Sequence, residues 1–390
     1  MNILMISPGS PSSETSGAGV AIHKIASELA AKTSLTIIQP EDVNTKERKV
    51  SMESFTDTAV VKDITKINVT SHIGPYAYSE TQEKAIQQEE LYKVRSELTV
   101  FTDGVIEEVN AVDFDIIYAH DWISFEAALK IKEVSKKPLV LHVHSLDVDR
   151  ISSVNHSWIF DLEQKAFEES DLILTVSQYT SRRIQEHYGI HIRKIKVVHN
   201  GVDIPPLVEA TRKFHEPVVL FAGRLSGQKG PQTFIKIAEE VLEHNPDVRF
   251  VIAGEGELKN DLLEMSAHKN IGDKVHFTGY ISRGEMNRVY SEAAVLCMPS
   301  VSEPYGLVAT EAAAAKIPVV ISKTSGAAEV LPEAVLVEHS DVNGFAKSIL
   351  DLLDNKASVD MITEKNFDSV KEMDWGRTAH KILEVLNSLN

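Results

Sequence analysis

Two cationic side chains occupy a glycine-rich turn in the second half of the sequence. Arg224 and Lys229 lie in the segment Gly223–Gly230, between the apolar run Val218–Ala222 and a segment with helical spacing. A guanidinium and an ammonium group in such a turn, at the carboxyl edge of a parallel sheet, are suited to hold a diphosphate. The turn does not match a Walker A loop. Exposed loop charges are the alternative interpretation, and we favour the phosphate interpretation because the chain as a whole is acidic.

Two glutamates eight residues apart form the most specific pattern in the chain. Pro304 disfavours the helical conformation at Glu303, so this carboxylate is expected on the loop that ends a strand. Glu311 follows inside a helix, and Gly306 and Leu307 in its first turn can offer backbone N–H groups to an anion. A loop carboxylate can accept hydrogen bonds from a sugar, and a helical one can reach a ribose diol. Two solvated glutamates would not need this proline and glycine.

Histidines follow two apolar runs in the first half. His120, with Asp121 and Trp122, ends one run, and His142 and His144 end the next. Such histidines can hydrogen-bond a sugar or stabilise positive charge that develops nearby. A single histidine is more often a satisfied polar group, but two at neighbouring strand ends favour a function. Zinc is disfavoured because no cysteine is near and the spacing fits no HExxH motif.

A glycine-containing segment also opens the first predicted helix. Glycines in Ser16–Gly19 would let the backbone approach an anion at the helix N-terminus. The dinucleotide pattern G-x-G-x-x-G fails because Ile22 stands where the third glycine would be. A second partial match at Gly254–Gly256 fails at Lys259. NAD binding is therefore disfavoured.

Two D-x-D strings could hold a divalent ion on a diphosphate. They are Asp113–Asp115 and Asp147–Asp149. The first precedes a predicted strand and so belongs to the wrong edge of the sheet. Arg224 and Lys229 already supply the positive charge that a metal would bring. We therefore expect no metal.

Alternating short apolar runs and helical segments must position these groups. This alternation predicts parallel sheets covered on both faces, in two doubly wound α/β series. Ligands of such sheets bind at the carboxyl ends of the strands, so a cleft is expected where the two sheets face each other. The predicted strands are Ile3–Ile6, Leu35–Ile38, Ile116–Tyr118, Leu139–Val143, Leu172–Val176 and Ile195–Val198, then Val218–Ala222, Arg249–Ala253, Lys274–Thr278, Ala294–Met298, Pro318–Ile321 and Ala334–Val337.

Length and composition set the domain organisation. The 390 residues favour two domains. The asparagine, glycine and proline content near 200–216 marks the linker. The expected parts are a first Rossmann-like domain over 1–203 with a helical insertion at about 41–111, a second over 204–372, and a C-terminal helix over 373–390 that crosses back to the first domain.

The charge balance excludes some partners. Lys plus Arg number 40 and Asp plus Glu 57, a net charge of −17, which should repel nucleic acid and anionic lipid headgroups. The basic stretch His191–Lys196 is more typical of a solvated loop than of a membrane contact. No transmembrane segment or signal peptide is recognisable. The single cysteine, Cys297, excludes an internal disulfide framework, and a cytoplasmic location is expected.

These motifs together resemble the retaining glycosyltransferases of family 4, two-domain enzymes of the GT-B fold, and most of all the glycogen-synthase-like members. The resemblance covers nearly the whole chain, and the E-x7-E spacing is its most specific mark. The matching segments are Ser16–Gly19, His120–Trp122, His144–Leu146, Asn200–Asp203, Gly223–Leu225, Lys229–Gly230 and Glu303 with Glu311.

The resemblance implies a role for each matching residue. It implies that Arg224 and Lys229 bind the donor diphosphate, Glu303 contacts the donor sugar, Glu311 holds the ribose and His144 lies beside the anomeric carbon. It adds the donor-binding residues Gly17, Gly19, Gly254, Tyr280, Gly306 and Leu307, and places His120, Asp121 and Trp122 on the acceptor side.

The resulting hypothesis is the retaining transfer of a hexose from a nucleotide diphosphate sugar to a hydroxyl acceptor. Glucose is the expected hexose, a glucan or another saccharide is the expected acceptor, and no cofactor or metal is required. Two alternatives stay open. A nucleotide-sugar epimerase of the same build would need no acceptor, and a non-catalytic sugar-nucleotide-binding protein would bind the donor without turnover.

Overall fold

The computed structural model describes residues 1–9, 17–40, 64–69, 71, 88–150, 157–205 and 214–389. The chain divides into two compact units. The first comprises Met1–Gly201 together with Trp375–Asn390, and the second comprises Val202–Asp374. Each unit is built on its own parallel sheet and has its own apolar core.

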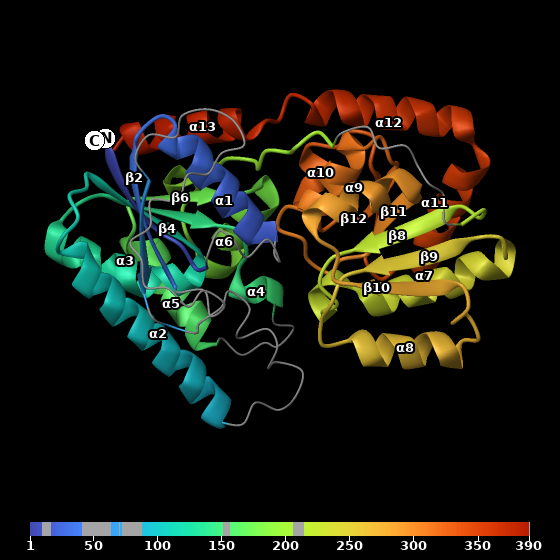
Figure 1. The fold of residues 1–390 in the computed structure, drawn as a ribbon, viewed down its shortest axis with the longest axis horizontal. Coiled ribbons are helices and arrows are strands. Elements are labelled where there is room, and N and C mark those ends of the chain that lie inside the picture. Colours follow the sequence, from blue (N-terminus) through green and yellow to red (C-terminus); the bar gives the residue numbers. More distant parts are fainter. Residues whose placement is uncertain are drawn as a thin grey trace. The chain divides into compact units, whose positions relative to one another are not determined.

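The first unit contains a sheet of seven parallel strands (Figure 1). The order is β3-β2-β1-β4-β5-β6-β7, so the chain winds outward in both directions from β1 and β4. The strands are β1 (Asn2–Ile6), β2 (Ser34–Pro40), β3 (Ile64–Val69), β4 (Ile116–His120), β5 (Leu139–Val143), β6 (Leu172–Thr175) and β7 (Ile195–Val197).

Helices cover both faces of this sheet. One group, α2, α3 and α5, packs together, and α1 packs against α13 from the end of the chain. The helices are α1 (Gly17–Ala30), α2 (Gln88–Val109), α3 (Asp121–Ser135), α4 (Asp147–Arg150), α5 (Trp158–Glu169), α6 (Gln178–Tyr188) and α13 (Trp375–Asn387), with a 3₁₀ turn η1 (Ile192–Lys194).

The second unit contains a sheet of six parallel strands in the order β10-β9-β8-β11-β12-β13. This is the doubly wound order, with its switch point between β8 and β11. The strands are β8 (Val218–Ala222), β9 (Arg249–Ala253), β10 (Val275–Gly279), β11 (Ala293–Met298), β12 (Val319–Ser322) and β13 (Val335–Val337). The helices are α7 (Pro231–His244), α8 (Lys259–His268), α9 (Arg283–Glu292), α10 (Leu307–Ala314), α11 (Val342–Asp354) and α12 (Lys356–Val370), with 3₁₀ turns η2 (Gly227–Lys229) and η3 (Gly326–Glu329).

The physical origin of the sheets is visible in their burial. Central strands such as β4, β5 and β8 are buried at every position, as expected for parallel strands with helices on both faces. Helix α7 buries one apolar stripe, including Phe234 and Val241, and leaves its charged positions outside. The predicted α/β fold class of two doubly wound sheets is confirmed, and each predicted strand overlaps an observed one.

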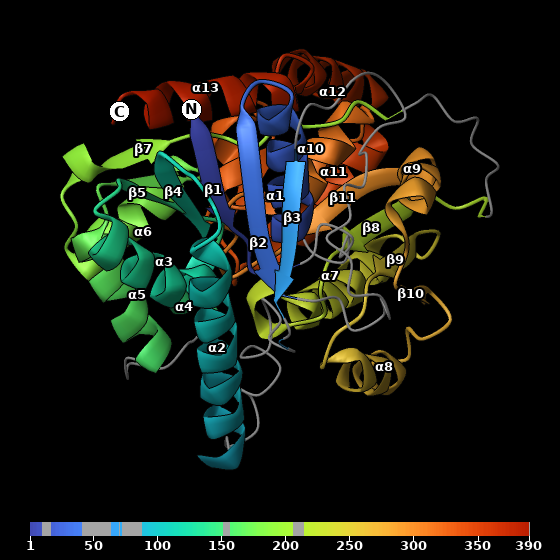
Figure 2. The ribbon, with the colours of Figure 1, turned by 60° about the vertical axis from the view of Figure 1, so that its left-hand side comes forward.

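One strand was missing from the prediction. The sequence pattern assigned the segment 41–111 to a helical insertion, but residues Ile64–Val69 form β3, which pairs in parallel with β2 at the sheet edge (Figure 2). The structure has helix α2 over Gln88–Val109 in this segment, and residues 41–63, 70 and 72–87 lie outside the described residues. The insertion therefore extends the sheet as well as adding a helix.

Candidate functional site

The basic turn and the Glu303 loop follow neighbouring strands of the second unit. The turn comes after β8 and the loop after β11, the two strands that flank the switch point. The Nζ atom of Lys229 lies 2.6 Å from Oε2 of Glu303. The Glu303 side chain is only 6% exposed, whereas that of Lys229 is 24% exposed. The structure thus joins two predicted donor-binding residues in one ion pair, 74 positions apart in the sequence.

Backbone hydrogen bonds hold the Glu303 loop in place. The N–H of Glu303 donates to the carbonyl of Thr324 at 2.9 Å, and the N–H of Gly326 donates to the carbonyl of Glu303 at 2.9 Å. The N–H of Val301 donates to the carbonyl of Gln228 at 2.9 Å, which links this loop directly to the basic turn. The carboxylate and its ammonium partner therefore sit on a connected backbone frame.

Helix α10 begins beside this ion pair. Gly306 precedes Leu307 with φ of 96°, and a Cβ atom there would lie 3.2 Å from Cγ of Glu303. The first backbone N–H groups of a helix lack partners within the helix and attract anions. Leu307 and Gly306 are thus placed at the helix start as the sequence predicted, next to the cation of Lys229. Arg224, half-buried, stands two residues after the end of β8 in the same turn.

Glu311 is held from a helix that the sequence had not implicated. Nη2 of Arg283 lies 3.1 Å from Oε1 of Glu311, and the hydroxyl of Tyr290 donates to Oε2 at 2.9 Å. Nη2 of Arg283 also lies 2.9 Å from Oδ2 of Asp203. Burial raises the pKa of Tyr290 well above its usual range, and Glu311 adds to the effect. The i, i+7 spacing of Arg283 and Tyr290 on α9 was the available signal, because it places both on one helix face.

The remaining predicted donor residues occupy distinct positions. Gly254 follows β9 and has φ of 152°, and a Cβ atom there would lie 1.9 Å from the carbonyl oxygen of Gly223. Tyr280 follows β10 and is 51% exposed. In the first unit, Gly17 and Gly19 lie in the first turn of α1, and Ser16 is outside the described residues.

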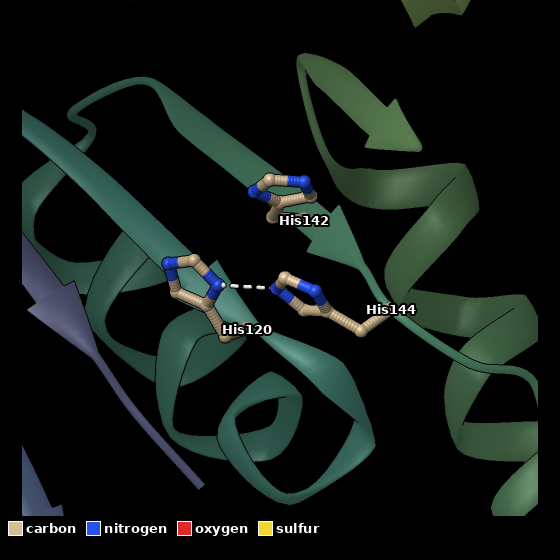
Figure 3. Close-up of side chains that lie close together, drawn as sticks. All are labelled: His120, His142 and His144. Carbon is tan, nitrogen blue, oxygen red and sulfur yellow. Dashed lines mark hydrogen bonds between the residues drawn. The ribbon is translucent and has the colours of Figure 1, made fainter. Parts of the chain in front are cut away.

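Three histidine rings cluster at the carboxyl ends of β4 and β5 (Figure 3). Nδ1 of His120 and Nε2 of His144 are 3.0 Å apart and hydrogen-bonded, and the Tyr118 hydroxyl lies 2.6 Å from Nδ1 of His142. All three rings are buried. Burial lowers the pKa of His120 and His142 well below the usual value and lowers that of His144 less, since Asp121 opposes the effect. The rings are therefore neutral near pH 7.

Asp121 shapes the turn that carries the cluster. Its backbone has φ of 53°, a conformation that is unusual for a residue with a side chain. Its Oδ1 accepts hydrogen bonds from the backbone N–H of His144 at 2.8 Å and of Ser145 at 3.3 Å. Trp122 is fully buried and makes an edge contact with Trp158 in the core, so its side chain offers no exposed surface to an acceptor.

Among the described residues, His120, His142 and His144 form a group whose side chains could act as metal ligands. One nitrogen from each ring lies within 4.8 Å of the others. The ring planes are tilted by 18° to 36° from one another. One ring nitrogen of each histidine is buried without a hydrogen-bond partner among the described residues: Nε2 of His120, Nε2 of His142 and Nδ1 of His144.

The D-x-D strings have partners within the first unit. Oδ2 of Asp115 accepts from the backbone N–H of Asn2 at 2.7 Å, at the amino end of β1. Oδ2 of Asp147 accepts from Ser157 at 2.6 Å, and Asp149 pairs with Arg183 at 3.3 Å. Both strings have structural roles in the unit that holds them.

The buried rings predict a dependence of stability on pH. The unfolded chain takes up protons near pH 6.5, while the folded rings stay neutral to lower pH, so stability should fall as the pH drops below about 6.5. Each ring contributes up to about 1.4 kcal/mol per pH unit. Glu163 opposes this trend, because burial and Asp147 raise its pKa well above the usual range. The melting temperature of His142→Gln should fall less between pH 7.5 and 5.5 than that of the parent.

A matched control for this experiment is His380→Gln, because the His380 side chain is 68% exposed on α13. Its pH profile should overlay that of the parent protein. An unchanged profile in His142→Gln would show that the ring is not kept neutral by its surroundings.

Solved structures of other proteins share this architecture. Sucrose-phosphate synthase from Thermosynechococcus elongatus has a TM-score of 0.82 at 21% identity and covers 100% of this chain and 99% of its own. Anabaena HepE in complex with UDP-glucose has a TM-score of 0.73 at 18% identity, with 100% of both chains covered. These structures define the fold as GT-B, with two parallel sheets flanked by helices.

Sequence comparison gives the family. A model described as Glycosyltransferase Family 4 matches residues 15–205, and one described as Glycosyl transferases group 1 matches residues 208–368. The chain belongs to the glycosyltransferases, with a family 4 domain in its first part and a group 1 domain in its second. This confirms the resemblance recognised from the motifs.

Individual relatives differ in how much of their length is matched. An uncharacterized glycosyltransferase of Methanocaldococcus jannaschii is 30% identical over 238 residues, 57% of this chain and 61% of the relative. A glycogen synthase of Mycobacterium tuberculosis is 28% identical over 253 residues, 63% of this chain and 61% of the relative. A D-inositol 3-phosphate glycosyltransferase of Corynebacterium glutamicum is 25% identical over 408 residues, which cover 96% of this chain and 92% of the relative. The match to the first two thus spans less than two thirds of their length. None of the described helices is both long and apolar enough to cross a bilayer.

Proposed function

We propose that the protein transfers a hexose, with glucose as the expected sugar, from a nucleotide diphosphate sugar to a hydroxyl acceptor with retention of anomeric configuration. The observation that carries the proposal is the Lys229–Glu303 pair at 2.6 Å, held at the switch point beside the start of α10. Relatives named glycogen synthase and inositol phosphate glycosyltransferase, and a GT-B structure that contains UDP-glucose, support a nucleotide-sugar donor.

In this proposal the second unit binds the donor. Arg224, Lys229 and the N–H groups at Gly306 and Leu307 neutralise the diphosphate as it leaves. Groups placed before the reaction where charge develops stabilise the transition state more than the ground state. Glu303 accepts hydrogen bonds from the donor sugar. Glu311 accepts hydrogen bonds from the ribose diol.

The proposed reaction needs no protein nucleophile. The bond between the anomeric carbon and the phosphate oxygen breaks, and the acceptor oxygen forms its bond on the same face of the sugar. The acceptor proton passes to an oxygen of the leaving diphosphate. His144 is proposed to lie beside the anomeric carbon, where a neutral imidazole can accept a hydrogen bond from the sugar. His142 contacts the His144 ring, Tyr118 is hydrogen-bonded to His142, and both side chains are buried.

A two-stage screen tests the proposal. UDP-, ADP- and GDP-glucose are first compared by thermal shift, and release of the nucleotide diphosphate is then measured with an α-glucan and with D-inositol 3-phosphate as acceptors. Transfer to an acceptor with the product in the donor's anomeric configuration supports the proposal. Conversion of the donor without acceptor would favour an epimerase. Binding without turnover on any acceptor would favour a non-catalytic sugar-nucleotide-binding protein.

Metal independence is a further prediction. Lys229 and Arg224 supply the positive charge that a divalent ion would bring to the leaving group, and a metal is not needed for that purpose. The rate in an excess of EDTA over trace metals should equal the rate without chelator. Loss of activity that Mg²⁺ or Mn²⁺ restores would revive the D-x-D strings as metal ligands.

A cytoplasmic location is also proposed. Cys297 is fully buried, and burial raises the pKa of its thiol, so the sulfur is an inert apolar side chain. A sequence with a single, buried cysteine suits a reducing compartment.

A further inference from the structure

The carboxylate of Glu311 is held on both of its oxygens by one helix. Arg283 is the first residue of α9, and its Nη2 lies 3.1 Å from Oε1 of Glu311. Tyr290 lies two turns further along α9, and its hydroxyl lies 2.9 Å from Oε2. Two donors on different oxygens fix the plane of a carboxylate, whereas a single donor leaves it free to rotate.

Both donors are themselves fixed. Tyr290 is 3% exposed, and its raised pKa keeps the hydroxyl protonated and able to donate. Arg283 is always charged, and Asp203 holds the same Nη2 atom at 2.9 Å. The start of α9 is capped by Ser282, whose hydroxyl donates to Glu285 at 2.6 Å and whose backbone N–H donates to the same carboxylate at 3.2 Å. The donors therefore come from a capped helix start and a buried ring.

An oriented carboxylate suits a vicinal diol. An ionised carboxylate accepts several hydrogen bonds and donates none, and both hydroxyls of a ribose can donate to it. The strength of such bonds depends on the direction of the oxygens, so a carboxylate held in one plane distinguishes a diol from a single hydroxyl better than a rotating one.

We propose that Arg283 and Tyr290 are positioning residues that orient Glu311 for the 2′- and 3′-hydroxyls of the donor nucleoside, with Asp203 as the anchor of Arg283. The proposal rests on the ribose role proposed for Glu311 above. It adds that selection of ribonucleotides over deoxyribonucleotides is set by α9 as much as by the carboxylate itself.

The test measures nucleotide binding by calorimetry and needs no acceptor. The tightest binder among UDP, ADP and GDP is compared with its 2′-deoxy and 3′-deoxy forms. The parent protein should bind the ribonucleotide about 10- to 100-fold more tightly than either deoxy form, since each lost bond to a charged group has a cost of that order. The ratio should fall to within about threefold of unity in Glu311→Gln, Arg283→Ala and Tyr290→Phe. Arg283→Lys, which keeps the charge, should retain an intermediate ratio.

The control is Arg249→Ala, because Arg249 makes a comparable ion pair with Glu216, at 2.9 Å, at the amino end of β9. Its ratio should equal that of the parent, and thermal melts of all variants confirm folding. A ratio that falls in Glu311→Gln but not in Arg283→Ala and Tyr290→Phe would overturn the inference and leave the ribose role standing. A parent ratio near unity would overturn both, and absence of any nucleotide binding would overturn the proposed function itself.

Discussion

Lys229→Ala is expected to lower kcat about 100- to 1,000-fold while the chain remains folded. Loss of one group that stabilises developing negative charge typically raises the barrier by about 2.7–4 kcal/mol. Lys229 is placed for this role because its ammonium lies 2.6 Å from Glu303, at the carboxyl edge of the sheet and beside the first turn of α10. The measurement is initial rate against donor concentration, with the donor and acceptor found by the screen above.

The same substitution leaves a carboxylate without its cation. Glu303 is 6% exposed, so part of the loss in Lys229→Ala can come from a displaced Glu303. Glu303→Gln keeps the side-chain shape and removes the charge. If Lys229 acts on the diphosphate itself, Lys229→Ala should weaken binding of the free nucleotide diphosphate and Glu303→Gln should not.

The control for this prediction is Lys259→Ala. Lys259 forms a similar ion pair with Glu255, at 2.8 Å, but both side chains are well exposed and stand on α8 and its preceding loop. Exposed pairs of this kind contribute about 0–1 kcal/mol to stability, and this one has no proposed part in the reaction. A kcat for Lys229→Ala within threefold of the Lys259→Ala value would contradict the assignment of the basic turn.

Gly254→Ala is expected to lower the free energy of unfolding of the second unit by about 2–6 kcal/mol, the largest stability effect among the variants proposed. The φ of 152° is a backbone conformation that side chains rarely adopt, which costs about 1–3 kcal/mol. A Cβ atom would also lie 1.9 Å from the carbonyl oxygen of Gly223, and overpacking of this kind costs about 1–3 kcal/mol.

The backbone around Gly254 has little freedom to relieve this contact. The N–H of Gly254 donates to the carbonyl of Gly279 at 2.9 Å, and the N–H of Gly223 donates to the carbonyl of Ala253 at 2.9 Å. Any shift that makes room for the methyl group must break one of these bonds or move the turn that carries Arg224. Donor binding should therefore weaken together with stability.

Chemical denaturation followed by circular dichroism measures this effect, and Gly284→Ala supplies the comparison. Gly284 lies in the first turn of α9, and no atom stands within 4 Å of a Cβ added there. Alanine in a helix is favoured over glycine by about 0.5–1 kcal/mol, so this variant should be as stable as the parent or slightly more so. Equal denaturation midpoints for Gly254→Ala and Gly284→Ala would contradict the steric conflict expected between a Cβ atom at Gly254 and the carbonyl oxygen of Gly223.

The strands were predictable because burial leaves a direct trace in sequence. Val218–Ala222 is apolar at every position, and Leu139–Val143 is apolar at every position except His142, as is typical of parallel strands between two helical layers. The missed strand β3 carries Thr65, Lys66 and Asn68, because an edge strand with exposed positions needs fewer apolar residues. Its pattern is not distinguishable from a polar loop by composition alone.

The candidate site was predictable only as separate pieces. The proline after Glu303 and the glycine before α10 placed Glu303 correctly on the loop after a strand and Gly306 at a helix start. The contact of Lys229 with Glu303 depends on the adjacency of β8 and β11, which the order of strands in the sequence does not reveal. Arg283 was missed for the same reason, since its partners Asp203 and Glu311 are distant in sequence and belong to other elements.

The histidines show what the sequence could not provide. The residues His120 and His142 are paired in the β4–β5 register, so their closeness follows once the strands are known. Their burial does not follow, because a polar ring at a strand end is compatible with both an open loop and a closed layer. The structure shows the closed arrangement, in which all three rings are buried.

The return of α13 to the first unit has a consequence for biosynthesis. The second unit is one uninterrupted stretch of chain, whereas the first needs residues made before it and after it. Helix α13 buries Trp375, Ala379, Ile382 and Leu386 in the first unit, and Gly201 lies directly against the backbone of Trp375. The part of the first unit that is translated first therefore exposes an apolar face until the second unit and α13 have been translated.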